Sequence, residues 1–390
     1  MKNTFFGVAA VFVVSVAIFS CSENNSSQQE ESVTKRQVIE TYADIAFANY
    51  KKAYDDAVVL EAAITTFTTT PTQANFDNAK AKWKLARESY GTTEAFRFAD
   101  GPIDNADGPE GLMNAWPLDE VYVDYVSGGA PNAGIINDLG AFPTINKSVL
   151  EGLNEQGGEK NISVGYHAIE FLLWGQDLTD PSASQPGLRP YTDYLTTGGT
   201  ASNQARRAAY LKACADLLTD NLDYLVNEWK VGGTYRNTFF ALSDNVALKN
   251  IYLGIVTLIT AELPEERMNT ALQNANQEDE HSCFSDNTHR DIALNLQGVI
   301  NIYQGHYSTV DGPSLQDLIR QADTTVYNDT ETSLNASSTK VAAIMIPFDW
   351  AISGGPTSVE GMKVSAARLQ LINFGANLLA GATKIGIVVN

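Results

Sequence analysis

The sequence predicts an all-α protein of two packed helical bundles joined by long irregular loops. Apolar residues recur at spacings of three and four in several long segments, which is the pattern of one buried helix face. The sequence has no set of alternating apolar and polar runs joined by Asn-Gly turns, which would predict hairpins. Stretches rich in Gly, Pro, Asn and Asp predict long loops at 101–117, 127–144, 177–199 and 354–361.

The first twenty residues predict a targeting segment rather than part of the fold. Lys2 precedes an apolar run from Phe5 to Ser20, and Cys21 follows that run directly. This order is typical of a bacterial lipoprotein signal that leaves Cys21 as the lipidated first residue; a plain secretory signal with an incidental cysteine is the alternative. Residues 21–33 are polar and low in complexity, so we expect a disordered tether that holds the protein to a membrane of the bacterial cell envelope.

The helices are expected in order along the rest of the chain. The first runs from near Thr34 towards Thr68, with or without a break. Residues 250–264 are apolar on all sides but too short to span a bilayer, so they predict a buried helix. Three amphipathic helices are predicted by the stripes Phe76, Ala79, Trp83, Ala86, Tyr90; Leu211, Cys214, Leu218, Leu222, Leu225, Trp229; and Ile292, Leu296, Val299, Tyr303.

The proline-rich loop at 177–199 is the expected boundary between two domains. An N-terminal helical domain would then cover residues 34–195, and a C-terminal helical bundle would cover residues 196–390. With 26 Lys and Arg against 46 Asp and Glu, the net charge of -20 argues against binding nucleic acid, or an anionic membrane, through a basic patch. Contact with the membrane is therefore expected through the lipid anchor only.

The stretch SVGYHAIEFLLWGQD, residues 163–177, places two ionisable side chains in an apolar helix. His167 and Glu170 are three residues apart, so they share one helix face. A buried carboxylate needs a cation, a set of hydrogen-bond donors or a metal ion beside it. Imidazole and carboxylate groups are ligands for iron and zinc. A His–Glu hydrogen bond inside the core is the alternative interpretation.

Glu94 is a second acid on a predicted inner face. It continues the stripe of Trp83, Ala86 and Tyr90 by four residues. It is therefore either a further metal ligand or the ion-pair partner of Arg87 and Arg97. Asp100 and Asp104 follow in a loop at the helix end.

A third stretch, QEDEHSCFSDNTHRDI, carries two of the four histidines. His289 extends the inner stripe of the following helix backwards, and Asp286 is among the residues suited to cap that helix. His281 lies in the loop before it. A ligand, a substrate clamp and a satisfied helix cap are all open interpretations of His289.

These three stretches resemble sequence blocks of one known protein family. GYHAIEFLLWGQD resembles the G-x-H-x-x-E signature of the imelysin family, with Gly165, His167 and Glu170 in its fixed places. WKLARESYGTTEAFRF and EDEHSCFSDNTHRDI are similar to other blocks of that family, and the likeness runs from about Thr34 to the C-terminus. It implies a bacterial envelope protein of two helical domains with a pocket between them. Imelysin-like proteins are associated with iron uptake, and the family has also been classed with metallopeptidases.

Carried over residue by residue, the resemblance implies a ligand set. His167 and Glu170 would contact the metal, and Glu94 and Asp104 would add further acids. Gly165 would allow close packing at the start of the helix. The residues expected to bind or to support the ligand are Gly165, Arg87, Arg97, Asp100, His281, Ser285, Asp286 and His289.

The expected function is that of an envelope lipoprotein that binds a metal ion or an iron species in an interdomain pocket for iron uptake. Iron is the expected cofactor, with zinc or calcium as alternatives, and outer-membrane uptake proteins are the expected partners. An H-x-x-E metallopeptidase is the first alternative. It would need three protein ligands, an open water position and a general base, more than one such motif supplies. A non-enzymatic surface binding protein with a structural His–Glu pair is the second.

Overall fold

Helices packed along their lengths make up most of the chain in the computed structural model, which describes residues 32–106 and 108–389. Within these residues the strands are β1 (His306–Tyr307) and β2 (Val310–Asp311), which pair antiparallel. The α-helices are α1 (Lys35–Thr69), α2 (Gln73–Gly91), α3 (Glu110–Met113), α4 (Glu120–Val123), α5 (Lys147–Leu153), α6 (Gly165–Trp174), α7 (Gln204–Trp229), α8 (Thr234–Ala241), α9 (Asp244–Thr257), α10 (Thr270–Asn274), α11 (Thr288–Gln304), α12 (Leu315–Ala322), α13 (Thr324–Ala342), α14 (Phe348–Ile352) and α15 (Val359–Lys384). Short 3-10 segments are η1 (Thr92–Phe96), η2 (Pro181–Ala183), η3 (Tyr191–Tyr194) and η5 (Gln277–Asp279), and η4 (Leu258–Asn269) is π-helical.

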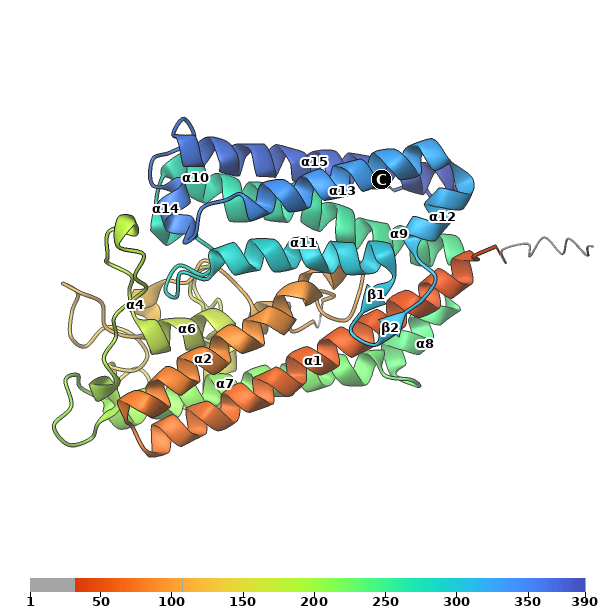
Figure 1. The fold of residues 1–390 in the computed structure, drawn as a ribbon. Helices are drawn as coiled ribbons and strands as arrows, with labels where there is room; N and C mark the ends of the chain where they lie inside the picture. Colours follow the sequence, from red (N-terminus) through yellow and green to blue (C-terminus); the bar gives the residue numbers. More distant parts are fainter. Residues whose placement is uncertain (1–31, 107, 390) are drawn as a thin grey trace, which may run out of the picture. The chain divides into compact units, whose positions relative to one another are not determined.

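One group of helices surrounds the apolar helix α6. Helix α1 begins at Thr34, whose hydroxyl caps the backbone of Gln37 while the Gln37 side chain bonds back to Thr34, a capping box that satisfies two free N–H groups. The buried face of α1 packs against α2 and α7, and α6 packs against α2 and α7 in turn (Figure 1). All ten residues of α6 are buried, because neighbours cover it on every side.

A second group is built around α15. This helix packs against α13 and η4, and α11 lies against α2, η1 and η4 (Figure 1). The contact between α11 and η1 is close because Gly298 has no side chain: a Cβ there would lie 2.4 Å from the carbonyl oxygen of Thr92. Helix α11 therefore joins the second group of helices to the segment that carries Glu94.

The predicted all-α class is confirmed. The three stripes are buried on α2, α7 and α11, and the first helix runs from Lys35 to Thr69 without a break. Asp244–Asn274 is long and apolar enough to cross a membrane, but 61% of its apolar window is buried inside the protein, as expected of a core helix. Residues 33–390 group as one compact unit, and the proposed boundary between residues 195 and 196 stays a prediction.

The remaining expectations concern the N-terminal segment and the end of the second helix. The signal segment 1–20, Cys21 and nearly all of the tether 21–33 lie outside the described residues. The helix expected to continue through Glu94 ends instead at Gly91 and tightens into η1. The hydroxyls of Thr92 and Thr93 bond to the carbonyls of Ser89 and Tyr90, and such local bonds compete with regular helix.

Candidate functional site

The site begins at the first residue of α6, where the backbone takes a conformation that suits glycine. Gly165 has a φ of 85°, and a Cβ at this position would lie 2.6 Å from the carbonyl oxygen of Met113. The close approach of these two segments brings Asn114, which follows Met113, near the first turn of α6. His167 and Glu170 then share one face of a fully buried helix.

His167 and Glu170 form a buried pair. His167 Nδ1 lies 3.0 Å from Glu170 Oε2, and Ser285 donates its backbone N–H (3.0 Å) and its hydroxyl (2.7 Å) to Glu170 Oε1. The side chains of His167 and Glu170 are 1% and 0% exposed. Burial raises the pKa of Glu170 to about 8, and burial together with Arg87 lowers the pKa of His167 to about 3. At neutral pH and without a cation, the pair therefore holds a neutral imidazole and a protonated carboxyl group, and a cation at the imidazole favours the ionised Glu170, which accepts the Nδ1 proton.

The other ring nitrogen of His167 is the unusual feature of the site. Nε2 is buried and has no hydrogen-bond partner. A buried polar atom without a partner costs about 1–3 kcal/mol, so it calls for a ligand. Histidines that bind metals through one nitrogen commonly donate the other N–H to a carboxylate, which sets the tautomer and the ring orientation.

A second histidine repeats this arrangement beside the first. His281 Nδ1 lies 2.8 Å from Asp291 Oδ2, and Arg87 donates to Asp291 Oδ1 at 2.9 Å. Burial by itself would raise the pKa of Asp291, but Arg87 together with the contacts of His281 and Ser282 outweighs burial and holds that pKa well below its usual range. The ionised carboxylate therefore accepts the Nδ1 proton of His281. The rings of His167 and His281 stand with centroids 4.8 Å apart at an angle of 76°.

Glu94 lies close to this histidine pair, but both of its oxygens are engaged. Arg267 donates to Oε2 at 2.6 Å and Asn114 donates to Oε1 at 3.1 Å, with Arg97 at 3.5 Å. Burial would raise the pKa of Glu94, but the attraction of Arg267 and then of Arg97 outweighs burial and lowers the pKa to about 2. Glu94 is thus a carboxylate held in an ion pair, which was one of the two interpretations of its position, but its main partner is Arg267, and Arg87 pairs with Asp291 instead.

An acidic cavity of about 420 Å³ opens beside the histidines. His281 and Trp116 line it, with ring centroids 5.8 Å apart. Its other charged lining residues are Glu110, Glu155, Glu159, Glu262, Glu266, Arg97 and Arg267. Five carboxylates against two guanidinium groups make this entrance attractive to cations.

Comparisons with known proteins bear on this geometry. The family model described as Imelysin (Peptidase_M75) matches residues 46–373. The chain belongs to the imelysin family. Over 306 residues it is 24% identical to iron-regulated protein A of Synechococcus elongatus, in an alignment that covers 75% of this chain and 71% of that protein.

Solved structures of imelysin-like proteins share the fold. A candidate iron-regulated protein A precursor from Parabacteroides distasonis superposes with a TM-score of 0.70 at 18% identity, covering 92% of this chain and 97% of that one. An imelysin-like protein from Psychrobacter arcticum superposes with a TM-score of 0.63 at 13% identity, covering 92% and 98%. At these identities the likeness concerns the fold alone.

In this imelysin-family chain, several residues expected at the site lie elsewhere. Asp104 accepts the backbone N–H of Phe98 at 2.7 Å, and the carbonyl of the exposed Asp100 accepts the hydroxyl of Tyr235. Asp286 follows Ser285 but lies with two other aspartates rather than with the histidine pair. Arg97, by contrast, stays beside the site, because it lines the acidic cavity and pairs there with Glu110.

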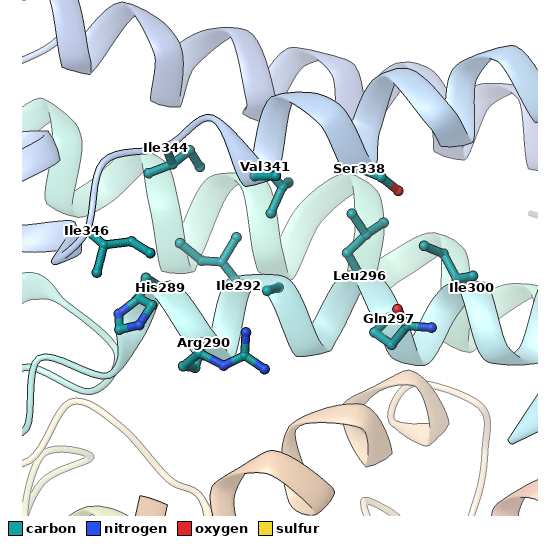
Figure 2. A pocket seen from close by; sticks show the side chains of 12 residues that line it. His289, Arg290, Ile292, Leu296, Gln297, Ile300, Ser338, Val341, Ile344 and Ile346 are labelled. Atoms are coloured by element: carbon teal, nitrogen blue, oxygen red, sulfur yellow. The ribbon is translucent and has the colours of Figure 1, made fainter. Parts of the chain in front are cut away.

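His289 lies in a different cavity, of about 370 Å³, between α11 and the end of α13. Figure 2 shows its ring at one end, with Ile292, Leu296 and Ile300 of α11 along the floor and Val341, Ile344 and Ile346 on the other side. Burial lowers the pKa of His289, and its Nδ1 is buried without a hydrogen-bond partner.

Three residues of the imelysin-family site were missed from the sequence. Asp291 orients His281, Arg267 neutralises Glu94, and Asn114 links Glu94 to Arg87 through bonds of 3.1 and 2.6 Å. A signal existed for Asp291, because it falls on the buried face of α11, four residues before Asn295. Arg267 and Asn114 carry no comparable sequence signal.

Proposed function

We propose that this imelysin-family protein is a cell-envelope lipoprotein that serves iron uptake. It would bind a divalent transition metal, preferably iron, between His167 and His281. The observation that supports binding is the buried, unpartnered Nε2 of His167 beside a second imidazole that is held by a carboxylate in the same way. The similarity to iron-regulated protein A supports an iron-related role.

The residues present fit such a metal. Imidazole nitrogens suit iron, zinc and copper, and both rings have Nδ1 engaged by a carboxyl group, which leaves Nε2 for coordination. The acidic cavity beside His281 would attract and admit the cation. In this proposal Glu170 and Asp291 orient the rings, and Glu94 balances the charge of Arg267.

The same contacts favour binding over peptide hydrolysis. A metallopeptidase needs a carboxylate free to take a proton from the attacking water. Glu170 has one oxygen occupied by two donors from Ser285 and the other facing His167, so neither oxygen faces a substrate position.

The test is calorimetry of the purified protein with Zn²⁺, and with Fe²⁺ under anaerobic conditions. We expect one ion per chain and a loss of affinity of about 10- to 100-fold in His167→Ala and in His281→Ala. His306→Ala is the matched control, because His306 is an exposed histidine on β1. If His167→Ala and His281→Ala are folded by circular dichroism and bind both ions as the wild type does, the metal site is wrong.

The envelope part of the proposal depends on Cys21. Incorporation of labelled fatty acid into the protein in bacterial cells, and its loss in Cys21→Ser, is the expected result. An unlabelled, freely soluble wild-type protein would contradict the lipid anchor while leaving the metal site untouched.

A further inference from the structure

Three aspartates from separate parts of the chain meet at a second place. Asp177 follows α6, Asp286 lies in the loop before α11, and Asp349 lies on α14. All three are buried, and one carboxylate oxygen of each lies within 4.8 Å of the others. They are distinct from the carboxyl groups that hold His167 and His281.

One oxygen of this group has no hydrogen-bond partner, although Asp177 Oδ1 accepts the backbone N–H and the hydroxyl of Thr179 at 3.0 and 2.9 Å. Oδ1 of Asp349 has no hydrogen-bond partner and is shielded from solvent, because the residue is only 3% exposed. Glu280, which is 1% exposed, has two buried oxygens without hydrogen bonds of good geometry. Glu280 is thus a fourth buried carboxyl group, and its charge interacts with that of Asp349.

The charge of the group is not compensated by the protein. Within residues 32–106 and 108–389, no Lys or Arg forms an ion pair within 4.0 Å of any of the three aspartates. Lys84 is the basic side chain that attracts the Asp286 carboxylate, and it is exposed. Such a group is stable either with added protons or with a bound cation.

We propose that Asp177, Asp286 and Asp349 bind one hard divalent cation, Ca²⁺, with Glu280 as a neighbouring carboxylate. All of the groups offered are oxygens, which Ca²⁺ prefers. Two oxygens on opposite sides of one Ca²⁺ are about 4.8 Å apart, since each Ca–O distance is about 2.4 Å. The three oxygens lie no more than 4.8 Å apart, so one Ca²⁺ can reach all of them, whereas Mg²⁺ usually keeps several waters and uses only one or two carboxylates.

The ion would join three segments that are far apart in the sequence. Asp286 is the next residue after Ser285, which holds Glu170, and Asp177 lies three residues after the end of α6. Asp349 ties the C-terminal α13–α15 region to both loops. The bound Ca²⁺ therefore stabilises the loops on which the histidine pair depends without being a ligand of that pair.

The experiment is calorimetry of the purified protein with Ca²⁺ alone, after removal of metals with a chelator. We expect one Ca²⁺ per chain, and an affinity at least about tenfold weaker in Asp177→Asn and in Asp349→Asn. Asp180→Asn is the matched control: it removes the same charge from an exposed residue three positions beyond Asp177, and we expect an affinity within about twofold of wild type.

Thermal unfolding separates a lost site from a misfolded variant. In chelator, Asp349→Asn should melt at or above the wild-type temperature, because Asn relieves repulsion within the buried group. On addition of Ca²⁺ the wild type should gain melting temperature and Asp349→Asn should gain little. A wild type that binds no Ca²⁺ at millimolar concentration, or an Asp349→Asn variant that binds it as tightly as wild type, overturns the proposal. Since His167→Ala should still bind Ca²⁺, failure at either site can be told from failure at the other.

Discussion

When ionised, as a cation at Nε2 favours, Glu170 holds the proton of His167 on Nδ1. One oxygen accepts both donors of Ser285, so the other oxygen faces Nδ1 of the imidazole. In Glu170→Gln the side-chain carbonyl would keep the two Ser285 donors, and the amide NH₂ would then face Nδ1. An NH₂ group can only donate, so Nδ1 would become the acceptor and Nε2 would carry the proton.

We therefore expect Glu170→Gln to fold and to bind Zn²⁺ and Fe²⁺ about 10- to 100-fold more weakly than the wild type in calorimetry. Glu266→Gln removes the same charge from the wall of the acidic cavity without a contact to either histidine, so it should weaken binding far less. Equal effects of the two variants would mean that charge, and not the tautomer of His167, controls the affinity.

For single residues, the sequence predicts those that are chemically out of place, and the family resemblance adds Ser285, but Asp291 was missed. His167 and Glu170 stand out because ionisable groups are rare in an apolar helix, and Glu94 stands out on an inner stripe. Ser285 and Asp291 reach the site from segments more than 100 residues after α6. That proximity is a result of packing, so local periodicity does not reveal it.

At the scale of elements, the contact between α11 and η1 depends on one glycine. Gly298 allows α11 to approach so closely that an added Cβ would meet Thr92 O at 2.4 Å and the Ala95 side chain at 3.1 Å. Thr92 and Ala95 flank Glu94, so this approach also sets the position of the Glu94–Arg267 ion pair. Gly298 therefore affects both the packing of α11 against η1 and the position of Glu94.

Gly298→Ala should destabilise the protein by about 2 kcal/mol, because overpacking against a backbone oxygen outweighs the gain of about 1 kcal/mol in helix propensity. Gly152→Ala in α5 is the matched control, since nothing lies within 4 Å of a Cβ at that position. That variant should be unchanged or up to about 1 kcal/mol more stable. Urea unfolding of both variants measures the difference, and equal stabilities would refute the role of the close contact.

The elements that could be predicted are those whose pattern is local. The stripes of α2, α7 and α11 appear in the sequence because each helix buries one face along its length. The end of α2 at Gly91, where the hydroxyls of Thr92 and Thr93 bond to carbonyls of the last turn, and the π-helical geometry of η4 leave no mark on the apolar spacing, so the periodicity continues past the point where α2 stops. Glu94 still faces inward, but from a 3-10 turn.

At the scale of the whole molecule, the all-α class follows from composition and periodicity, whereas the ion pairs that cross it do not. The Glu94–Arg267 pair joins η1 to η4 across 173 positions of sequence, and both side chains are almost fully buried. Glu94 loses its proton at a lower pH in the folded protein than in the unfolded chain. Folding stability is therefore linked to pH through this carboxylate.

The direction of this pH dependence follows from the two pKa values of Glu94. The pKa of Glu94 is about 2 in the folded protein against 4.5 as its ordinary value, so the unfolded chain binds more protons between these pH values. The contribution of Glu94 is fully present above pH 4.5 and is lost as the pH falls towards 2. It amounts to about 3 kcal/mol at neutral pH.

We expect the difference in free energy of unfolding between the wild type and Glu94→Gln to show this dependence directly. Gln approximates the protonated acid, so the wild type should be more stable by about 3 kcal/mol at pH 6, and the advantage should shrink steadily as the pH is lowered from 4.5 to 3. Urea unfolding at each pH gives the two free energies. An advantage that stays constant over this range would show that Arg267 stabilises Glu94 no more than water does, and the buried ion pair would then have to be assigned a role in positioning rather than in stability.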